Sequence, residues 1–175
     1  MEMVWDEADR GLGVEEYVCP HGKLVLDARW FPVLVTGSVG EVEHAGVVAL
    51  CDWMDRMVEE ACARDVALVT ITSTAGTKRP RKEDVRYIMA RADARTERAP
   101  GRVIAGLVVV EGAVMRGIVA LALWLGKQPI RMTTVASMSE AVGRARQLLE
   151  QAGVAVPPDL DDVSTMGLGS LTKVS

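Results

Sequence analysis

Apolar residues recur at helical spacing between Glu41 and Arg64, and this is the clearest periodic pattern in the chain. The recurring residues, at i, i+4, i+7, i+11 and i+14, are Val47, Cys51, Met54, Val58 and Ala61. Such spacing puts them on one face of an amphipathic helix. Upstream, residues 23–29 alternate apolar and polar side chains, and 33–39 form a second short run after Pro32. The pattern predicts a β-hairpin followed by a long helix.

Two short apolar runs follow, at 66–72 and 103–110, and β-branched residues dominate each of them. Runs of this length between polar residues are typical of strands that are covered on both faces. We therefore expect each run to form a buried strand, and we expect residues 130–135 to form a further strand after a turn at 126–129.

Helical patterns separate these runs. Residues 80–99 form a strongly charged segment, and 113–125 are apolar nearly all round. A capping box at Ser137-Met138-Ser139-Glu140 begins a last helix that ends at Gly153. Strands that alternate with helices require a largely parallel sheet. We therefore predict an α/β fold: a single domain with a mixed, largely parallel sheet of four to five strands, flanked by about four helices.

Both ends of the chain differ from this regular middle. Residues 1–22 mix charges with glycines, so we expect a loose lead-in that is able to add an edge segment. Residues 153–175 contain two adjacent prolines, several aspartates and scattered glycines, a composition typical of a mobile tail. The predicted division is a lead-in at 1–22, an α/β domain at 23–152 and a mobile tail at 153–175.

Length and composition favour a protein of the cytoplasm. The chain has 175 residues, 49% of them hydrophobic, which suits one domain with a substantial core. The odd number of cysteines suggests a reducing compartment, and the acidic N-terminus lacks a signal-peptide pattern. The most apolar window, 112–125, is too short to cross a bilayer. We expect no transmembrane segment.

Charge is segregated along the chain. Residues 78–102 contain nine cations and four anions, a net charge of +5, while the remainder carries −9. The overall charge of −4 argues against general nucleic-acid binding. The basic segment favours an acidic protein partner or a second copy of the chain. The alternative is a solvated helix whose charges pair within it.

The segment from Thr72 to Lys82, called here the 72–82 loop, joins a predicted buried strand to the charged helix. Its hydroxyl and cationic side chains are Thr72, Ser73, Thr74, Thr77, Lys78, Arg79, Arg81 and Lys82. Such a loop at a helix N-terminus could be phosphorylated or bind a protein. It could also hold a phosphate-bearing ligand, or its hydroxyls could simply cap the strand. On the helix, Arg91 and Arg95 share one flank and are further candidates for contact with an acidic partner.

The apolar segment 113–125 cannot turn all its side chains to one sheet. We expect its outer side to contact a second copy of the chain, which makes the protein a homo-oligomer. Burial under the N-terminal segment or the tail is the alternative. The candidate contact residues are Met115, Ile118, Leu121 and Trp124.

No motif for catalysis or cofactor binding is present. His21 and His44 have no companion at metal-ligand spacing, and the three cysteines form no metal-binding pattern. The sequence contains no nucleophile elbow, P-loop or dinucleotide fingerprint. We therefore expect no enzyme, no metal and no cofactor.

The order and spacing of several short segments resemble a known family. These segments are Trp30-x-Pro32-Val33-Leu34, Val66-Ala67-Leu68-Val69, the helix with Arg86, Arg91 and Arg95, Val103-Ile104-Ala105-Gly106, Val114-Met115-Arg116-Gly117-Ile118 and Ser137-Met138-Ser139-Glu140-Ala141. Together they resemble the STAS domain of sulfate-transporter tails and anti-sigma-factor antagonists, and more closely its divergent, single-domain bacterial members. The resemblance covers residues 23–152.

In phosphorylatable members of that family, an Asp-Ser pair follows the central strand. The matching place here is Thr72-Ser73-Thr74, which lacks the aspartate, and the loop is longer and more basic. The missing aspartate and the longer loop count against a serine phosphoswitch at this place, but they do not count against the fold. The resemblance implies a regulatory or adaptor protein that works by protein–protein interaction through the 72–82 loop and the adjoining helix. The alternative is a carrier or sensor of a phosphate-bearing or lipid-like small molecule.

Overall fold

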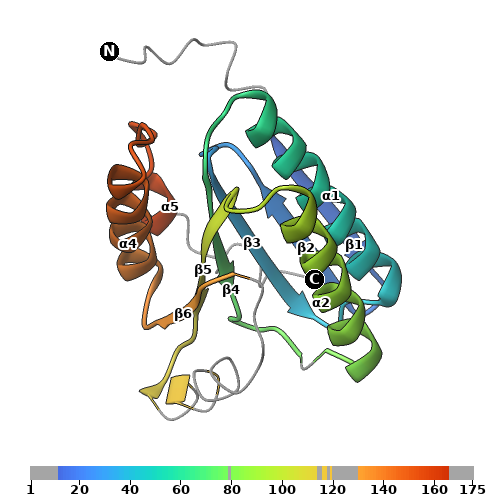
Figure 1. Ribbon diagram of the computed structural model, residues 1–175. Helices are drawn as coiled ribbons and strands as arrows, with labels where there is room; N and C mark the ends of the chain where they lie inside the picture. The colour runs from blue at the N-terminus through green and yellow to red at the C-terminus, as the bar shows by residue number, and fades with distance from the viewer. Residues whose placement is uncertain (1–11, 79, 114–115, 118, 120–129, 166–175) are drawn as a thin grey trace.

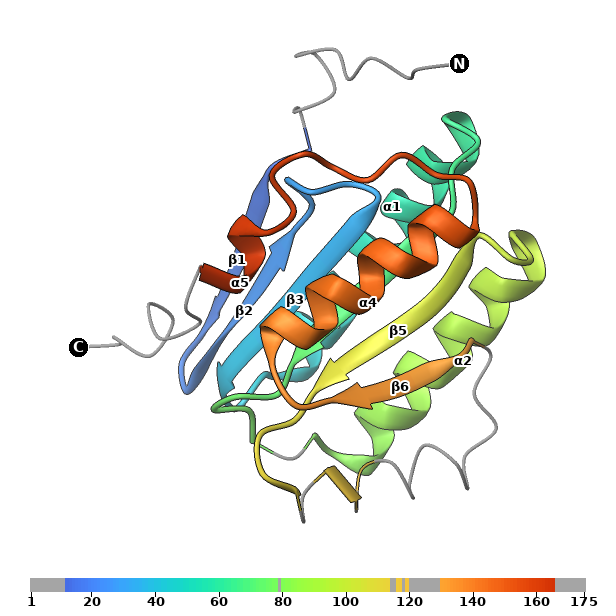
Figure 2. The ribbon, with the colours of Figure 1, turned by 90° about the vertical axis from the view of Figure 1, so that its left-hand side faces the viewer.

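A six-stranded sheet forms the centre of the computed structural model, which describes residues 12–78, 80–113, 116–117, 119 and 130–165. Helices α1 and α2 cover one face of the sheet, and α4 and α5 cover the other (Figures 1 and 2). The strands are β1 (Val14–Cys19), β2 (Gly22–Asp27), β3 (Val33–Gly40), β4 (Leu68–Ser73), β5 (Val103–Val109) and β6 (Met132–Val135). The helices are α1 (His44–Ala63), α2 (Lys82–Arg98), α4 (Met138–Gln151) and α5 (Asp162–Thr165).

The strands lie in the sheet in their order along the chain. β1, β2 and β3 are antiparallel neighbours, and β3 to β6 are parallel. This confirms a single α/β domain with a mixed, largely parallel sheet. The predicted number of strands was too low, because β1 lies within the predicted lead-in. Its sequence VEEYVC alternates poorly, and β1 is held by full antiparallel pairing with β2 rather than by burial of its own side chains.

Each face of the sheet has its own apolar core. Leu68, Val69 and Ile71 of β4 are completely buried, because helices cover both faces of this central strand. On the α1 side, Leu68 packs in a cluster with Leu34, Trp53, Met57 and Ala61. On the α4 side, Val69 and Ile71 pack in a cluster with Leu107, Ala145 and Leu149. Most side chains at 66–72 are therefore apolar because neither face of this strand is exposed to water.

The predicted capping box is present at the start of α4. The Glu140 amide donates to Ser137 Oγ at 3.2 Å. The Glu140 carboxylate returns to the amide of Ala136 at 2.7 Å, one residue before the expected cap amide. The first bond satisfies a backbone donor that the first helical turn leaves free, and the second holds the chain between β6 and α4.

The first part of the predicted mobile tail instead packs on the sheet. Leu160 and Val163 are buried in the α4-side core, and Trp30 Nε1 donates to the Asp159 carbonyl at 3.1 Å. The composition was misleading because two apolar side chains three positions apart anchor an otherwise polar segment. The ordered domain therefore extends at least to Val163.

The four candidate contact residues for self-association, Met115, Ile118, Leu121 and Trp124, lie outside the described residues, and so does Arg79 of the 72–82 loop. Within the described ranges, none of the helices combines the length and the apolar character needed to cross a bilayer.

Candidate functional site

The 72–82 loop leaves the carboxyl end of β4 and is fixed to the end of β3. Thr77 forms a parallel bridge with Gly40, in which the Gly40 amide donates to the Gly76 carbonyl at 2.9 Å and the Lys78 amide donates to the Gly40 carbonyl at 3.0 Å. Gly40 and Gly76 both have φ near +70° to +80°, a conformation that glycine adopts without strain. The middle of the loop is therefore held against the sheet by backbone hydrogen bonds.

Two of the loop's hydroxyl side chains are used at the end of β4. Thr72 Oγ1 lies 3.0 Å from Thr36 Oγ1 on the neighbouring strand. Ser73 is only 3% exposed, and its hydroxyl accepts from the Ala75 amide at 3.3 Å. A kinase could not reach the Ser73 hydroxyl without local opening of this strand end.

The other two hydroxyls connect the loop to its neighbours on each side. Thr74 Oγ1 donates to the Val109 carbonyl of β5 at 2.8 Å. Thr77 Oγ1 donates to the Ser38 carbonyl of β3 at 3.0 Å. Thr77 is exposed, whereas Thr74 is half-buried. Of the four hydroxyl residues, Thr77 is therefore the accessible one. The Ser73 bond is local, whereas the hydroxyls of Thr72, Thr74 and Thr77 bond to the neighbouring strands β3 and β5.

Cations surround the end of the loop where α2 begins. Lys78 and Lys82 are exposed, and so is Arg86 one turn into the helix. Arg81, the residue before α2, pairs with Glu41 at 3.2 Å, and this hydrogen bond raises the pKa of the guanidinium. None of the ion pairs among the described residues involves Lys78, Lys82 or Arg86.

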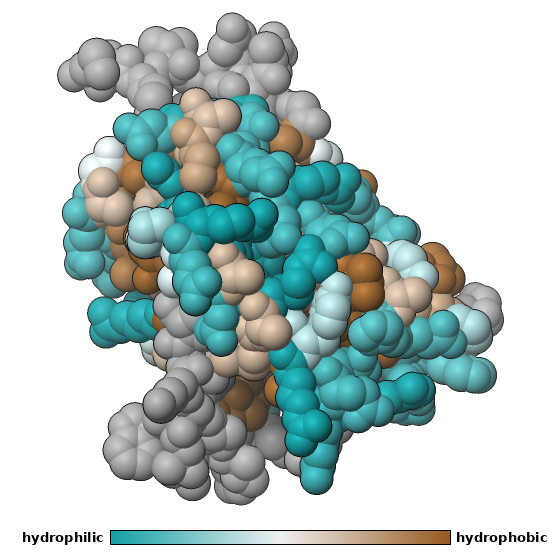
Figure 3. Space-filling model, turned by 45° about the vertical axis from the view of Figure 1, so that its right-hand side comes forward, coloured by the Kyte–Doolittle hydropathy of each residue, from teal (hydrophilic) through white to brown (hydrophobic). Residues whose placement is uncertain are grey.

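A small pocket of about 120 Å³, called here the loop pocket, opens beside these cations. It lies between the loop, the start of α1 and the first turns of α2. Its apolar lining comes from Leu24, Val42, Val47, Leu50 and Ile88. Its polar rim comes from Ser38, Glu41, Thr77, Lys78 and Arg81. On the side of the molecule that carries α1 and α2, hydrophilic side chains predominate and apolar atoms are visible in small separate groups (Figure 3).

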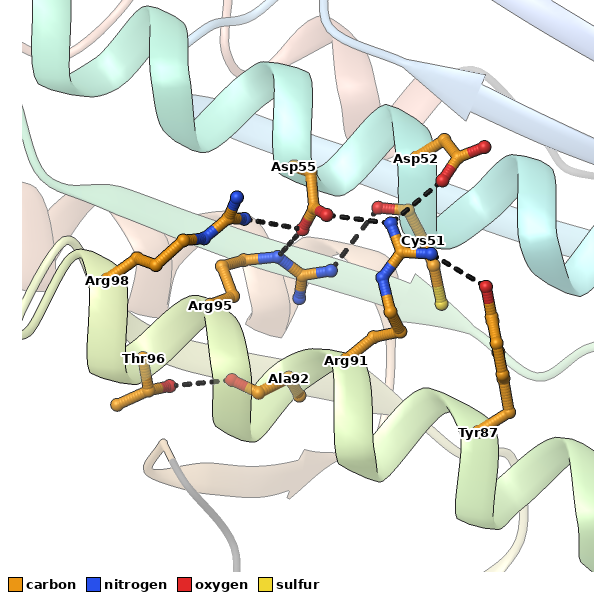
Figure 4. A network of polar contacts seen from close by, with 9 residues as sticks. All are labelled: Cys51, Asp52, Asp55, Tyr87, Arg91, Ala92, Arg95, Thr96 and Arg98. Atoms are coloured by element: carbon orange, nitrogen blue, oxygen red, sulfur yellow. Dashed lines mark hydrogen bonds and ion pairs between the residues drawn. The ribbon is translucent and has the colours of Figure 1, made fainter.

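Arg91 and Arg95 do not belong to this surface, because they face α1 (Figure 4). Asp55 of α1 accepts from Arg91 Nη2 and Arg95 Nε, each at 2.7 Å, and lies 3.4 Å from Arg98 Nη2. Arg91 also donates to Asp52 at 2.8 Å. We call these five residues the interhelical ion-pair cluster. The ion pairs of these arginines therefore join α2 to α1 and do not form within α2, where Arg91 donates only to the Tyr87 hydroxyl at 2.7 Å.

Burial and pairing within this cluster act on Asp55 in opposite directions. Burial raises the pKa of the Asp55 carboxyl, but hydrogen bonds from Arg91 and Arg95 outweigh it, so the pKa lies below its usual value. Arg95 is 9% exposed and also donates to the Cys51 carbonyl at 3.3 Å. The cluster explains how α2, whose apolar stripe is thin, is held against α1.

His44 has a partner that its sequence context did not indicate. His44 Nδ1 lies 2.7 Å from Asp84 Oδ1, and Asp84 is 2% exposed. The rings of His44 and Tyr87 meet edge to face at 5.3 Å. His44 is the first residue of α1 and Asp84 lies in the first turn of α2, so this pair joins the beginnings of the two helices and keeps the loop pocket between them.

Sequence reasoning found the loop and its cations but missed Glu41 and the apolar lining of the pocket. The apolar lining residues come from β2, α1, α2 and the segment just before α1, and no spacing pattern in the sequence relates them. Among the described residues, no group of three or more His, Cys, Asp or Glu side chains is placed to hold a metal ion.

No protein-family model, curated protein or solved structure matches the chain. The site is therefore interpreted from its own geometry.

Proposed function

We propose that this chain is a non-enzymatic regulatory or adaptor protein of STAS-like fold, which binds an acidic surface of another protein through the 72–82 loop and the first turns of α2. The observation that carries the proposal is the set of exposed cations, Lys78, Lys82 and Arg86, on a loop and helix start that are held in place. A fixed array of charges loses little freedom on binding, which favours affinity for a complementary surface.

The STAS-like assignment is supported by the arrangement of the elements. An antiparallel hairpin precedes three parallel crossovers, and the loop after central strand β4 leads into the second helix, as the resemblance implies. Because Ser73 is buried, a serine phosphoswitch at this place gains no support. Thr77, exposed and beside Lys78, is the better candidate for modification. We place the protein in the cytoplasm and expect self-association through residues 113–125.

Charge reversal tests the partner surface. The native chain and a Lys78→Glu/Lys82→Glu variant would each be used to capture partners from the source cell, with quantification by mass spectrometry. The matched control is Arg131→Glu/Arg144→Glu, which reverses two exposed cations outside the loop and α2. We expect a partner that the native chain and the control retain and the loop variant loses. Equal retention by both variants would contradict the proposal.

A small-ligand carrier or sensor is the second candidate, and the loop pocket is the observation that favours it. The pocket has an apolar lining and cations at its mouth, but its volume is about 120 Å³, whereas sites for drug-sized ligands usually enclose about 300–1,000 Å³. A nucleotide or a lipid would not fit without opening it. A thermal-shift screen with nucleotides and phospholipids tests this function, because a ligand of the native state must raise Tm with its concentration.

A further inference from the structure

The loop pocket is the right size for one apolar side chain. An apolar cavity of about 150 Å³ accommodates one benzene molecule, so the roughly 120 Å³ of this pocket suits a group of about four or five carbons. Leu24 and Val47 at its floor are buried, while Val42, Leu50 and Ile88 are half-buried. The wall residues therefore keep apolar surface that an inserted aliphatic group would remove from water.

The rim favours a negative group beside that side chain. Lys78 and Arg81 stand at the mouth together with Glu41, so the described rim carries one more positive than negative charge. Arg81 uses only Nη2 to pair with Glu41, and both of these side chains remain about half exposed. The remaining donors of the Arg81 guanidinium and the Lys78 ammonium can still bind a carboxylate.

We propose that the loop pocket anchors one branched aliphatic side chain of the partner protein, with a neighbouring carboxylate of the partner bound by Lys78 and Arg81. This inference rests on the proposed function and names the partner's chemistry: a segment in which Leu, Ile or Val stands next to an acidic residue. A central apolar anchor within a charged rim is the arrangement that concentrates binding energy in protein interfaces.

A small mimic tests the pocket without the partner. The probe is 4-methylpentanoate, which combines a leucine-like side chain with a carboxylate, titrated into the full chain and followed by amide chemical shifts in NMR. Acetate lacks the aliphatic group, and 4-methyl-1-pentanol lacks the charge. We expect shifts around Val42, Leu50 and Thr77 for the full probe, and binding at least about fivefold weaker for either fragment. Equal effects of acetate and the full probe would overturn the apolar anchor.

Two substitutions on different elements provide a matched pair for the partner itself. Ile88→Gln puts an amide into the pocket wall, whereas Val14→Gln makes a similar polar change at a 41% exposed position on β1, outside the loop and α2. We expect Ile88→Gln to weaken both the probe and the partner about five- to tenfold, and Val14→Gln to change neither. Thermal unfolding of both variants checks that each is folded, and Leu50→Gln on α1 repeats the test from the opposite wall.

The outcomes separate this inference from the proposed function. If Lys78→Glu/Lys82→Glu loses the partner and Ile88→Gln retains it as well as Val14→Gln does, the surface is correct and the anchor is wrong. If charge reversal leaves the partner bound, the proposed function fails, and the inference drawn from it fails too even where the probe still binds.

Discussion

Replacing Asp55 by asparagine tests whether ion pairs hold α2 in place. The Asp55 side chain is 18% exposed and accepts from Arg91 and Arg95, while Arg98 lies nearby. The substitution keeps the size of the side chain and removes its charge. Arg91 then still has Asp52 as a counterion, and Arg98 is largely solvated. The loss of the counterion therefore mainly affects Arg95, whose side chain is 10% exposed.

The magnitude follows from the burial of Arg95. Breaking a fully buried ion pair costs about 3–5 kcal/mol, because a charge is left without a counterion. Here the cost is lower, since Asp55 is partly solvated and Arg95 keeps its bond to the Cys51 carbonyl. We expect Asp55→Asn to lower the free energy of unfolding by about 2–3 kcal/mol. With a urea m-value of about 2 kcal/mol/M, the midpoint falls by about 1–1.5 M.

Asp52→Asn is the matched control on the same helix. Asp52 is 59% exposed and pairs only with Arg91 among the described residues, and Arg91 keeps Asp55. An exposed pair of this kind contributes less than about 1 kcal/mol. Urea unfolding measures both variants, and amide hydrogen exchange reports whether α2 loosens first. If both substitutions cost the same small amount, apolar packing holds α2 and the reasoning is refuted.

The same reasoning fixes the pH dependence. Because the folded pKa of Asp55 lies below its unfolded value of about 3.9, its contribution is fully present above that value. The contribution is lost as pH falls through the folded pKa. The difference in unfolding free energy between the native chain and Asp55→Asn should therefore be constant from about pH 5 to 8 and shrink below about pH 4.

Three further predictions concern the fold and its assembly. Leu160→Ala should lower the free energy of unfolding by about 2–4 kcal/mol, measured by urea unfolding. Val18→Ala, at a 74% exposed position, should change this free energy by less than about 0.5 kcal/mol. Equal effects would mean that the C-terminal segment does not pack on the sheet. Ser137→Ala should cost about 1 kcal/mol by loss of the N-cap, and Ser139→Ala next to it should cost less. Light scattering at two protein concentrations should show an oligomer, and a strict monomer would contradict the expected self-association.

Much of the fold follows from local patterns. Residues 66–72 are mostly apolar because the strand they form is covered on both faces, and the stripe of α1 repeats because one side of that helix faces the sheet. The capping box similarly marks the start of α4. Such patterns depend only on the period of a strand or a helix, so they can be read without knowing which elements meet.

Local patterns do not predict the contacts between elements that are distant in the sequence, and the candidate site consists of such contacts. Arg91 and Arg95 were candidates for a partner, but folding places their counterion Asp55 opposite them from another helix. The cations on the loop were visible in the sequence, whereas the apolar pocket beside them required β2, α1 and α2 to converge. The sequence by itself located strands β2 to β6, helices α1, α2 and α4, and the positive charge, but not β1 or α5. Only the tertiary structure decided which charges are paired and which remain exposed, because pairing depends on distances between side chains that the order of residues does not contain.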